Sequence, residues 1–160
     1  VTTSESLANA VSDEVERQLK LLPRESIARP AIENNSYIAV MDSIEDMFTV
    51  MNEVAPEHLE IQLPDPMNYM SLVQNAGSVF LGAYASEPLG DYVGGTNHVL
   101  PTSGTARFSS PLGVYDFVKR TSFTQFTKER LEEVAKHITT LARTEGLEAH
   151  ARAIEVRFEK

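Results

Sequence analysis

The sequence predicts an α/β fold in which helices alternate with the strands of a layered sheet. Apolar residues first recur at helical spacing over residues 4–22. Two short apolar runs, 37–40 and 77–82, then lie close to turn residues, and residues 59–63 alternate between apolar and polar side chains, as strands do. The resulting order of helix, strand, helix, strand, helix and strand is typical of layered α/β proteins.

The N-terminal helix is the most strongly patterned element. Ser4 is suited to cap its first turn, because a serine oxygen accepts a backbone N–H there, and Pro23 ends it. A second, shorter helix is expected over residues 25–33 and is disturbed by Pro30. The apolar stripe of the first helix consists of Leu7, Val11, Val15, Leu19 and Leu22.

The sheet is predicted in the following segment. Residues 37–40 and 77–82 are expected to form buried strands, and residues 59–63 a half-buried one. Ser43, with Asp46 three residues later, resembles a capping box and predicts a helix to about residue 52.

A Gly-, Pro- and Ser-rich segment, residues 82–111, follows the sheet. We expect an ordered functional loop region, because the segment holds many apolar and aromatic side chains. Before it, Pro66 is suited to the first turn of a short helix that ends near residue 73.

The last third of the chain is predicted to be helical. Residues 121–126 are β-prone, but Thr127 can cap a helix with apolar residues at helical spacing. Gly146 ends that helix, and a final helical segment covers residues 147–158. The chain thus divides into an α/β part and a C-terminal helical part, residues 1–112 and 113–160.

The composition excludes several classes of protein. The 160 residues include no cysteine, which excludes disulfide scaffolds, thiolate metal sites and cysteine nucleophiles. A formal net charge of −9 disfavours nucleic acid as a partner, and no apolar run is long enough to span a membrane. We expect a cytoplasmic protein, or a plastid one if the source is a plant.

Glu57 and His58 stand directly before a predicted strand. At a strand entrance both side chains can reach one cleft, where a carboxylate and an imidazole share acid–base work. The alternative is a surface pair at the edge of a strand.

Two further candidates lie in the loop region. Asp91 has Gly90 before it and Gly94 shortly after it, so the backbone can approach a ligand closely. Its carboxylate could bind a metal or orient a base, or it could form an Asx turn. His98 is either a ligand or a buried histidine satisfied by loop carbonyls.

Glu145 and His150 lie on either side of Gly146. If the last helix starts after Gly146, both side chains could face one pocket, and the alternative is a solvated helix terminus. His137 lies on the polar side of its helix and is assigned no function. No His-Glu-x-x-His, Walker A or Gly-x-Gly-x-x-Gly motif occurs.

Longer motifs resemble the histidinol dehydrogenase family over essentially the whole chain. The resemblance implies an incomplete Rossmann-like layered sheet with a helical C-terminal extension. The motifs are Ala-Pro-Glu-His-Leu-Glu at 55–60, Ser-Glu-Pro-Leu-Gly-Asp-Tyr at 86–92, Gly-Thr-Asn-His-Val-Leu-Pro-Thr at 95–102, Ala-Arg-Phe-Ser-Ser-Pro-Leu at 106–112 and Glu-Gly-Leu-Glu-Ala-His-Ala at 145–151.

The resemblance also implies an activity. The family oxidises L-histidinol to L-histidine through histidinal, the last steps of histidine biosynthesis, with NAD and zinc. By resemblance, Glu57 and His58 are the acid–base pair, and Asp91 and His150 are zinc ligands. A neutral imidazole suits removal of the hydroxyl proton, and a carboxylate suits activation of water. The implied substrate-binding residues are His58, Glu87, Asp91, His98, Glu145 and His150.

Two kinds of partner are implied as well. The family enzyme is a homodimer, and its C-terminal segment, here carrying Glu145 and His150, reaches into the partner's site. The family chain is also longer, and its N-terminal half supplies most of the NAD site and two further zinc ligands. We therefore expect a C-terminal portion that binds histidinol and zinc weakly and is inactive alone.

Two other function classes are weighed against this one. The first is a stand-alone, non-catalytic ligand-binding module of the same fold, which retention of the acid–base pair and zinc ligands disfavours. The second is a metal-dependent hydrolase using Glu57, His58 and Asp91, which no hydrolase motif supports.

Overall fold

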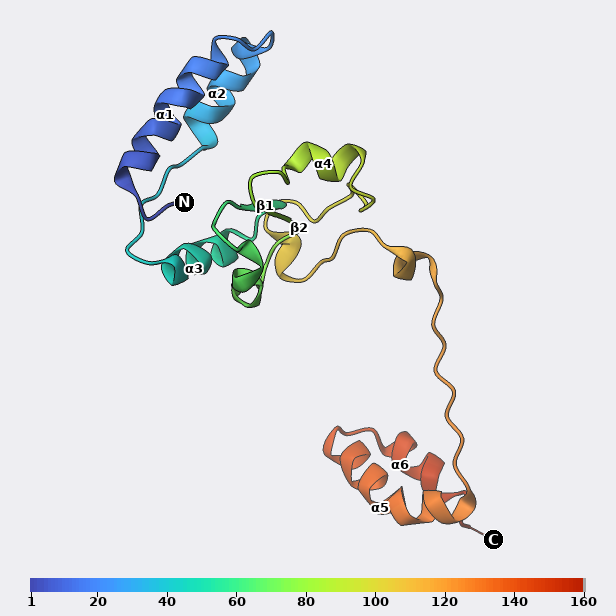
Figure 1. Cartoon of the computed structure of the whole chain (residues 1–160). Helices are drawn as coiled ribbons and strands as arrows, with labels where there is room; N and C mark the ends of the chain where they lie inside the picture. Colours follow the sequence, from blue (N-terminus) through green and yellow to red (C-terminus); the bar gives the residue numbers. More distant parts are fainter. Residues whose placement is uncertain (160) are drawn as a thin grey trace. The chain divides into compact units, whose positions relative to one another are not determined.

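The computed structural model describes residues 1–159 and divides the chain into two compact units, Val1–Phe117 and Val118–Lys160 (Figure 1). Helices and a small parallel sheet make up the first unit, and two helices dominate the second. The predicted α/β class is confirmed. Among the described residues, no helix is both long and apolar enough to cross a bilayer.

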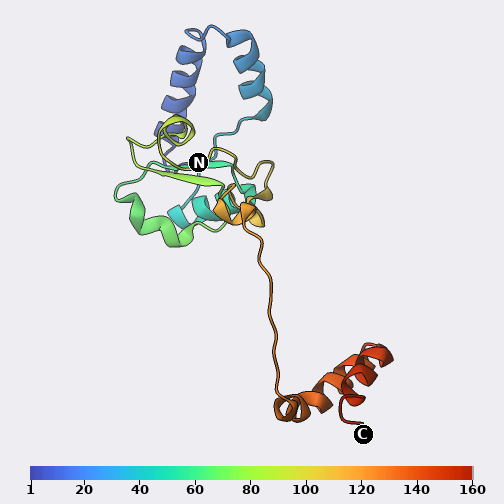
Figure 2. The same ribbon diagram turned by 90° about the vertical axis from the view of Figure 1, so that its right-hand side faces the viewer.

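Two helices, α1 (Glu5–Leu19) and α2 (Glu25–Asn35), lie side by side as a hairpin (Figures 1 and 2). As predicted, the Ser4 hydroxyl caps α1, accepting the Leu7 N–H at 3.2 Å. Arg29 of α2 joins the helices, because its guanidinium binds Glu16 of α1 at 2.8 Å and Glu25 at 2.7 Å. The second helix runs on past Pro30 to Asn35, slightly longer than predicted.

The sheet consists of β1 (His58–Ile61) and β2 (Ser78–Leu81), which pair in parallel. Helix α3 (Ile44–Val54) packs on one face, where Phe48 meets the buried Leu59 and Ile61 of β1. The predicted capping box of α3 is present: the Ser43 hydroxyl accepts the Asp46 N–H at 3.1 Å and donates to the Asp46 carboxylate at 2.6 Å. A 3₁₀ segment, Pro66–Leu72, connects the strands.

Asn52 of α3 clamps the chain that leads into β2. Its side-chain amide donates to the Leu72 carbonyl at 2.8 Å, and its side-chain oxygen accepts the N–H groups of Gln74 and Asn75 at 2.8 and 3.1 Å. The Asn75 side chain returns a hydrogen bond to the Asn52 carbonyl at 3.0 Å. This clamp fixes where β2 begins relative to α3.

The buried strand predicted at residues 37–40 is wrong, and the β-prone residues 121–126 form no strand. Residues 37–40 make one bridge, between Thr2 and Val40, and Tyr37 is 90% exposed. A strand is stabilised by hydrogen-bonded neighbours along its length, which a single bridge does not provide. Residues 121–126 have no regular secondary structure, and Phe123 is exposed.

The predicted loop region, residues 82–111, contains a short helix, α4 (Glu87–Tyr92), and a 3₁₀ turn, Thr105–Arg107; a second 3₁₀ turn, Val114–Phe117, follows it. Arg107 ties the loop to the end of α3, because its guanidinium donates to the carbonyls of Glu53 and Gly104. Because Asp91 lies within α4, it is on a helix rather than in the predicted glycine-flanked loop.

The second unit is a hairpin of α5 (Lys128–Thr144) and α6 (Glu148–Glu155), which pack through the buried Ala142 and Ala151. Thr127 caps α5 as predicted. Gly146 has φ 74°, and its N–H and that of Leu147 bond back to the α5 carbonyls, which ends the helix in a Schellman motif.

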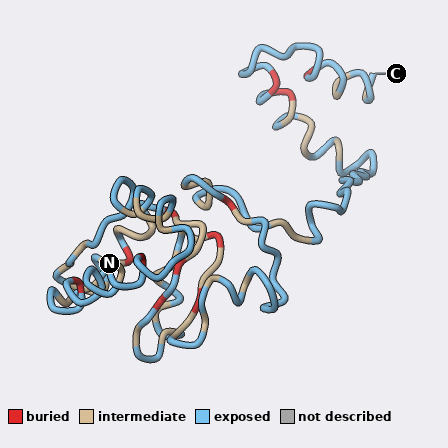
Figure 3. Tube along the Cα trace, turned by 90° about the horizontal axis from the view of Figure 1, so that it is seen from above, coloured by how far each residue is buried: buried red, intermediate tan, exposed pale blue. Residues whose placement is uncertain are grey.

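Buried residues occupy only a few short stretches of the chain (Figure 3). Among the described residues they comprise nine apolar residues with Thr139, Gly77 and Pro101, and none of their side chains is both large and fully buried. Many large apolar side chains are exposed instead, among them Leu7 at 53% and Val11 at 44% of their surface.

Candidate active site

The two faces of the β1–β2 sheet differ in chemistry. His58 pairs with Ser78 and Glu60 pairs with Phe80, so these four side chains share one face. We call this the polar face. The opposite face carries the buried Leu59 and Ile61 and belongs to the core.

Helix α4 is attached to the polar face at two points. The Glu87 N–H, in its first turn, donates to the Glu60 carboxylate of β1 at 3.1 Å. Gly90 lies against Phe80 of β2 so closely that a Cβ atom there would be 2.9 Å from two ring carbons. The Phe80 ring in turn lies 6.1 Å from the His58 imidazole, centroid to centroid, tilted by 34°.

These contacts bring together three side chains of the types that can ligate a metal. One ligand atom each of His58, Glu87 and Asp91 lies within 4.8 Å of the other two. Glu87 and Asp91 are four residues apart and project from the same side of α4. His58 and Glu87 are half-buried and Asp91 is exposed, so the cluster is open to solvent.

The carboxylates of the cluster repel one another. The pKa of Glu87 is raised, first by desolvation and then by a hydrogen bond to Asp91 and the negative charges of Asp91 and Glu60; the charge of His58 opposes these effects. A cation would relieve this repulsion. Carboxylate oxygen is a donor that zinc accepts in proteins, so the carboxylates of the cluster fit zinc, and the imidazole beside them suits acid–base work.

The other predicted site residues lie outside this cluster. Glu57 is half-buried just before β1, and its carbonyl accepts the Ser78 N–H at 2.8 Å. His98 is exposed in the loop that follows α4. Glu145, at the end of α5, and His150, in the first turn of α6, are exposed within the second unit.

Two residues of the polar face were not predicted from the sequence. Glu60 and Phe80 hold α4, although no function was assigned to either. The alternation of residues 59–63 could have placed Glu60 on the same face as His58. Phe80 could not be found this way, because its position opposite Glu60 depends on the register of β2.

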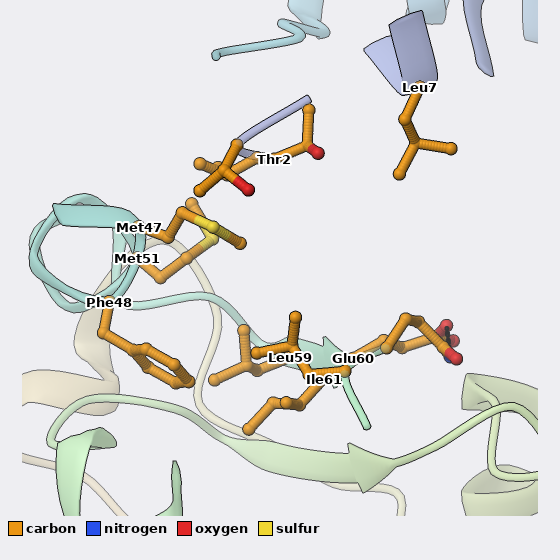
Figure 4. A pocket seen from close by; sticks show the side chains of 12 residues that line it. Thr2, Leu7, Met47, Phe48, Met51, Leu59, Glu60 and Ile61 are labelled. Carbon is orange, nitrogen blue, oxygen red and sulfur yellow. Dashed lines mark hydrogen bonds between the residues drawn. The ribbon is translucent and has the colours of Figure 1, made fainter. Parts of the chain in front are cut away.

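A separate cavity of about 240 Å³ lies on the core side of β1 (Figure 4). The side chains of Leu59 and Ile61 form its floor, and Met47 and Met51 of α3 and Leu7 of α1 line its walls. These side chains are apolar, although Thr2, Thr3, Glu60 and Gln62 also line the cavity. It is suited to contact with another apolar surface rather than to acid–base chemistry.

Known proteins are similar to this chain in sequence and in fold. The family model described as histidinol dehydrogenase matches residues 1–158. A curated histidinol dehydrogenase of Lactiplantibacillus plantarum is 68% identical over 159 residues, and one of Streptococcus mutans is 59% identical over 160 residues. These matches cover 99% and 100% of this chain.

A solved structure agrees with the sequence matches. The crystal structure of histidinol dehydrogenase from Elizabethkingia anophelis superposes with a TM-score of 0.84 and 40% sequence identity over 98% of this chain. The chain spans 36% of that protein, 37% of the L. plantarum relative and 38% of the S. mutans relative. The similarity therefore covers nearly all of this chain and little more than a third of each relative.

Proposed function

The chain belongs to the histidinol dehydrogenase family, and from this premise we propose that it forms part of an enzyme that oxidises L-histidinol to L-histidine through histidinal, with NAD and zinc, in histidine biosynthesis. The observation that carries the proposal is the cluster of His58, Glu87 and Asp91 on the polar face. It places a base beside carboxylates that suit a cation.

When bound, NAD accepts one hydride in each of the two oxidations, and zinc holds the imidazole and amine of the substrate in place. We propose Asp91 and His150 as zinc ligands from this chain. The position of Asp91 within the cluster supports its part of this assignment.

The acid–base work falls to Glu57 and His58 in this proposal. His58 takes the hydroxyl proton as the substrate carbon loses hydride, which turns the alcohol into an aldehyde. Glu57 then removes a proton from the water that adds to the aldehyde carbon, and loss of a second hydride gives the carboxylic acid. The position of His58, within 4.8 Å of ligand atoms of Glu87 and Asp91, supports its place in the site.

The remaining site residues bind substrate in this proposal. The carboxylates of Glu145 and Glu87 contact its polar and cationic groups, and His98 belongs to the surrounding loop. We propose further that the enzyme is a homodimer in which the C-terminal segment with Glu145 and His150 serves the partner's site.

Activity is proposed to require the rest of the family polypeptide, because this chain spans 37% of the L. plantarum relative. The test is a chimera in which this chain replaces the matching 159 residues of that relative. With histidinol, NAD and Zn²⁺, the chimera should form NADH, and the 160-residue chain alone should not. A folded but inactive chimera would contradict the function, and NADH formation by the chain alone would contradict its dependence on the remainder.

A further inference from the structure

The short helix α4 carries two of the three clustered side chains, but it has few stabilising interactions of its own. It has six residues, and the side chain of its N-cap residue, Ser86, makes no capping hydrogen bond. Helices this short are unstable alone, and their first N–H groups need outside acceptors. The position of Glu87 and Asp91 therefore depends on what α4 contacts.

Glu60 provides one such contact from 27 residues away. One oxygen of its carboxylate accepts the Glu87 N–H at 3.1 Å, and the other accepts the Gln62 side-chain amide at 3.2 Å. The two oxygens thus have different partners, and only the first one reaches α4.

Strand β1 carries both Glu60 and His58, so the hydrogen bond that Glu60 accepts holds α4 close to the imidazole. Glu60 is two residues from His58 on β1 and projects from the same face of the sheet. It also stands opposite Phe80, whose ring contacts both Gly90 and His58. One rigid pair of strands therefore carries the imidazole and both attachment points of α4.

From this geometry we infer that Glu60 is a positioning residue, which holds α4 on the sheet so that Asp91, the zinc ligand of the proposed function, lies beside His58. The metal part of the inference rests on the proposed function. Glu60 touches neither substrate nor metal in this account and acts through α4.

Three substitutions of Glu60 distinguish the effect of its hydrogen bond to α4 from the effect of its negative charge. E60A removes the acceptor, E60Q keeps an acceptor oxygen at the same reach without the charge, and E60D keeps the charge with a shorter side chain. Q62A is the matched control, because it removes the partner of the other carboxylate oxygen and leaves the contact to α4 in place.

Two measurements on the full 160-residue chain test the inference. The first is amide hydrogen exchange in α4 by NMR without metal, and the second is calorimetric titration with Zn²⁺ alone. E60A and E60D should speed exchange at the Glu87 amide and weaken Zn²⁺ binding by about 10- to 100-fold, the usual cost of losing a residue that orients metal ligands. E60Q should restore both properties, and Q62A should change neither.

The positioning role of Glu60 and the proposed metal site are contradicted by different results. Normal α4 exchange and normal Zn²⁺ affinity in E60A would overturn the positioning role. Loss in E60Q with recovery in E60D would overturn it too, because charge rather than the hydrogen bond would then be responsible. Faster α4 exchange in E60A, together with a wild-type chain that binds no Zn²⁺, would support the contact and overturn the proposed metal site.

Discussion

Gly90 of α4 lies directly against the ring of Phe80 on β2, where a Cβ atom would come within 2.9 Å of two ring carbons. Because Phe80 is buried, the ring has little room to move aside. The contact sets the distance between α4 and the sheet, and with it the distance between Asp91 and His58.

Replacing Gly90 with alanine tests this contact. We expect G90A to push α4 off the sheet and to destabilise the first unit by about 1–3 kcal/mol, the usual cost of overpacking. Urea unfolding measures the loss, and the NMR signals of the His58 ring should shift. G113A is the control, since a Cβ at Gly113 meets its nearest neighbours at 3.9 Å; equal stability of the two variants would show that the Phe80 contact is unimportant.

The Asn52 clamp gives a second prediction. N52A leaves the Leu72 carbonyl and the N–H groups of Gln74 and Asn75 without their partner. We expect a loss of about 1–3 kcal/mol in the free energy of unfolding, because these groups are partly shielded from water. N52D keeps the acceptor but places a charged oxygen against the Leu72 carbonyl in place of the donor, so it should also be less stable than wild type in the same urea experiment. A wild-type midpoint for N52A would contradict the clamp.

The raised pKa of Glu87 predicts a pH dependence. Because the folded state holds the Glu87 proton more tightly than the unfolded state, this group favours folding below its ordinary pKa of 4.5, and the contribution is lost as the pH rises through the higher folded value. E87Q should therefore be more stable than wild type at neutral pH and equal to it at about pH 3. Thermal unfolding across this range measures the difference. E53Q, which changes an exposed carboxylate elsewhere in the unit, should show no such trend.

The ion pair between Arg29 and Glu16 predicts the opposite trend for the α1–α2 hairpin. Hydrogen bonds from Arg29 and Lys20 lower the pKa of Glu16 to about 2. The advantage of wild type over R29M should be present above pH 4.5 and disappear as the pH falls toward 2. Thermal unfolding of both proteins at each pH checks this. A constant difference between pH 2 and pH 7 would mean that packing rather than charge joins the helices.

The exposed apolar residues around the core-side cavity predict self-association of the isolated chain. Leu7 lines this cavity and is 53% exposed, and surfaces of this kind usually contact another protein surface. Light scattering should show a mass that rises with concentration, and L7S should reduce it. L141S, at a comparably exposed position of α5, is the control. A wild-type monomer at high concentration would contradict the prediction.

Local patterns predicted the helices well and the sheet less well. Ser4, Ser43 and Thr127 all cap helices as expected, because a cap and its helix are neighbours in sequence. Residues 37–40 have the composition of a strand, yet Tyr37 is exposed, because strand formation depends on partners that composition does not specify.

In the candidate site, too, residue types were predictable from the sequence, but the contacts between distant segments were not. His58 and Asp91 were identified by motif and residue type, but their approach to each other depends on α4 folding as a helix and docking on β2. Glu60 and Phe80 support that docking through contacts between segments far apart in sequence. Such contacts follow from strand register, which the sequence of one strand does not determine.

We propose His58 as the proton acceptor of histidinol oxidation, and the kinetics of the chimera with the L. plantarum relative test this role. We expect H58Q to lower kcat for histidinol oxidation by about 10²- to 10⁴-fold while bound Zn²⁺, measured by elemental analysis, stays unchanged. H137Q, which alters an exposed histidine of α5, should retain full activity. An H58Q chimera with undiminished kcat would contradict the account.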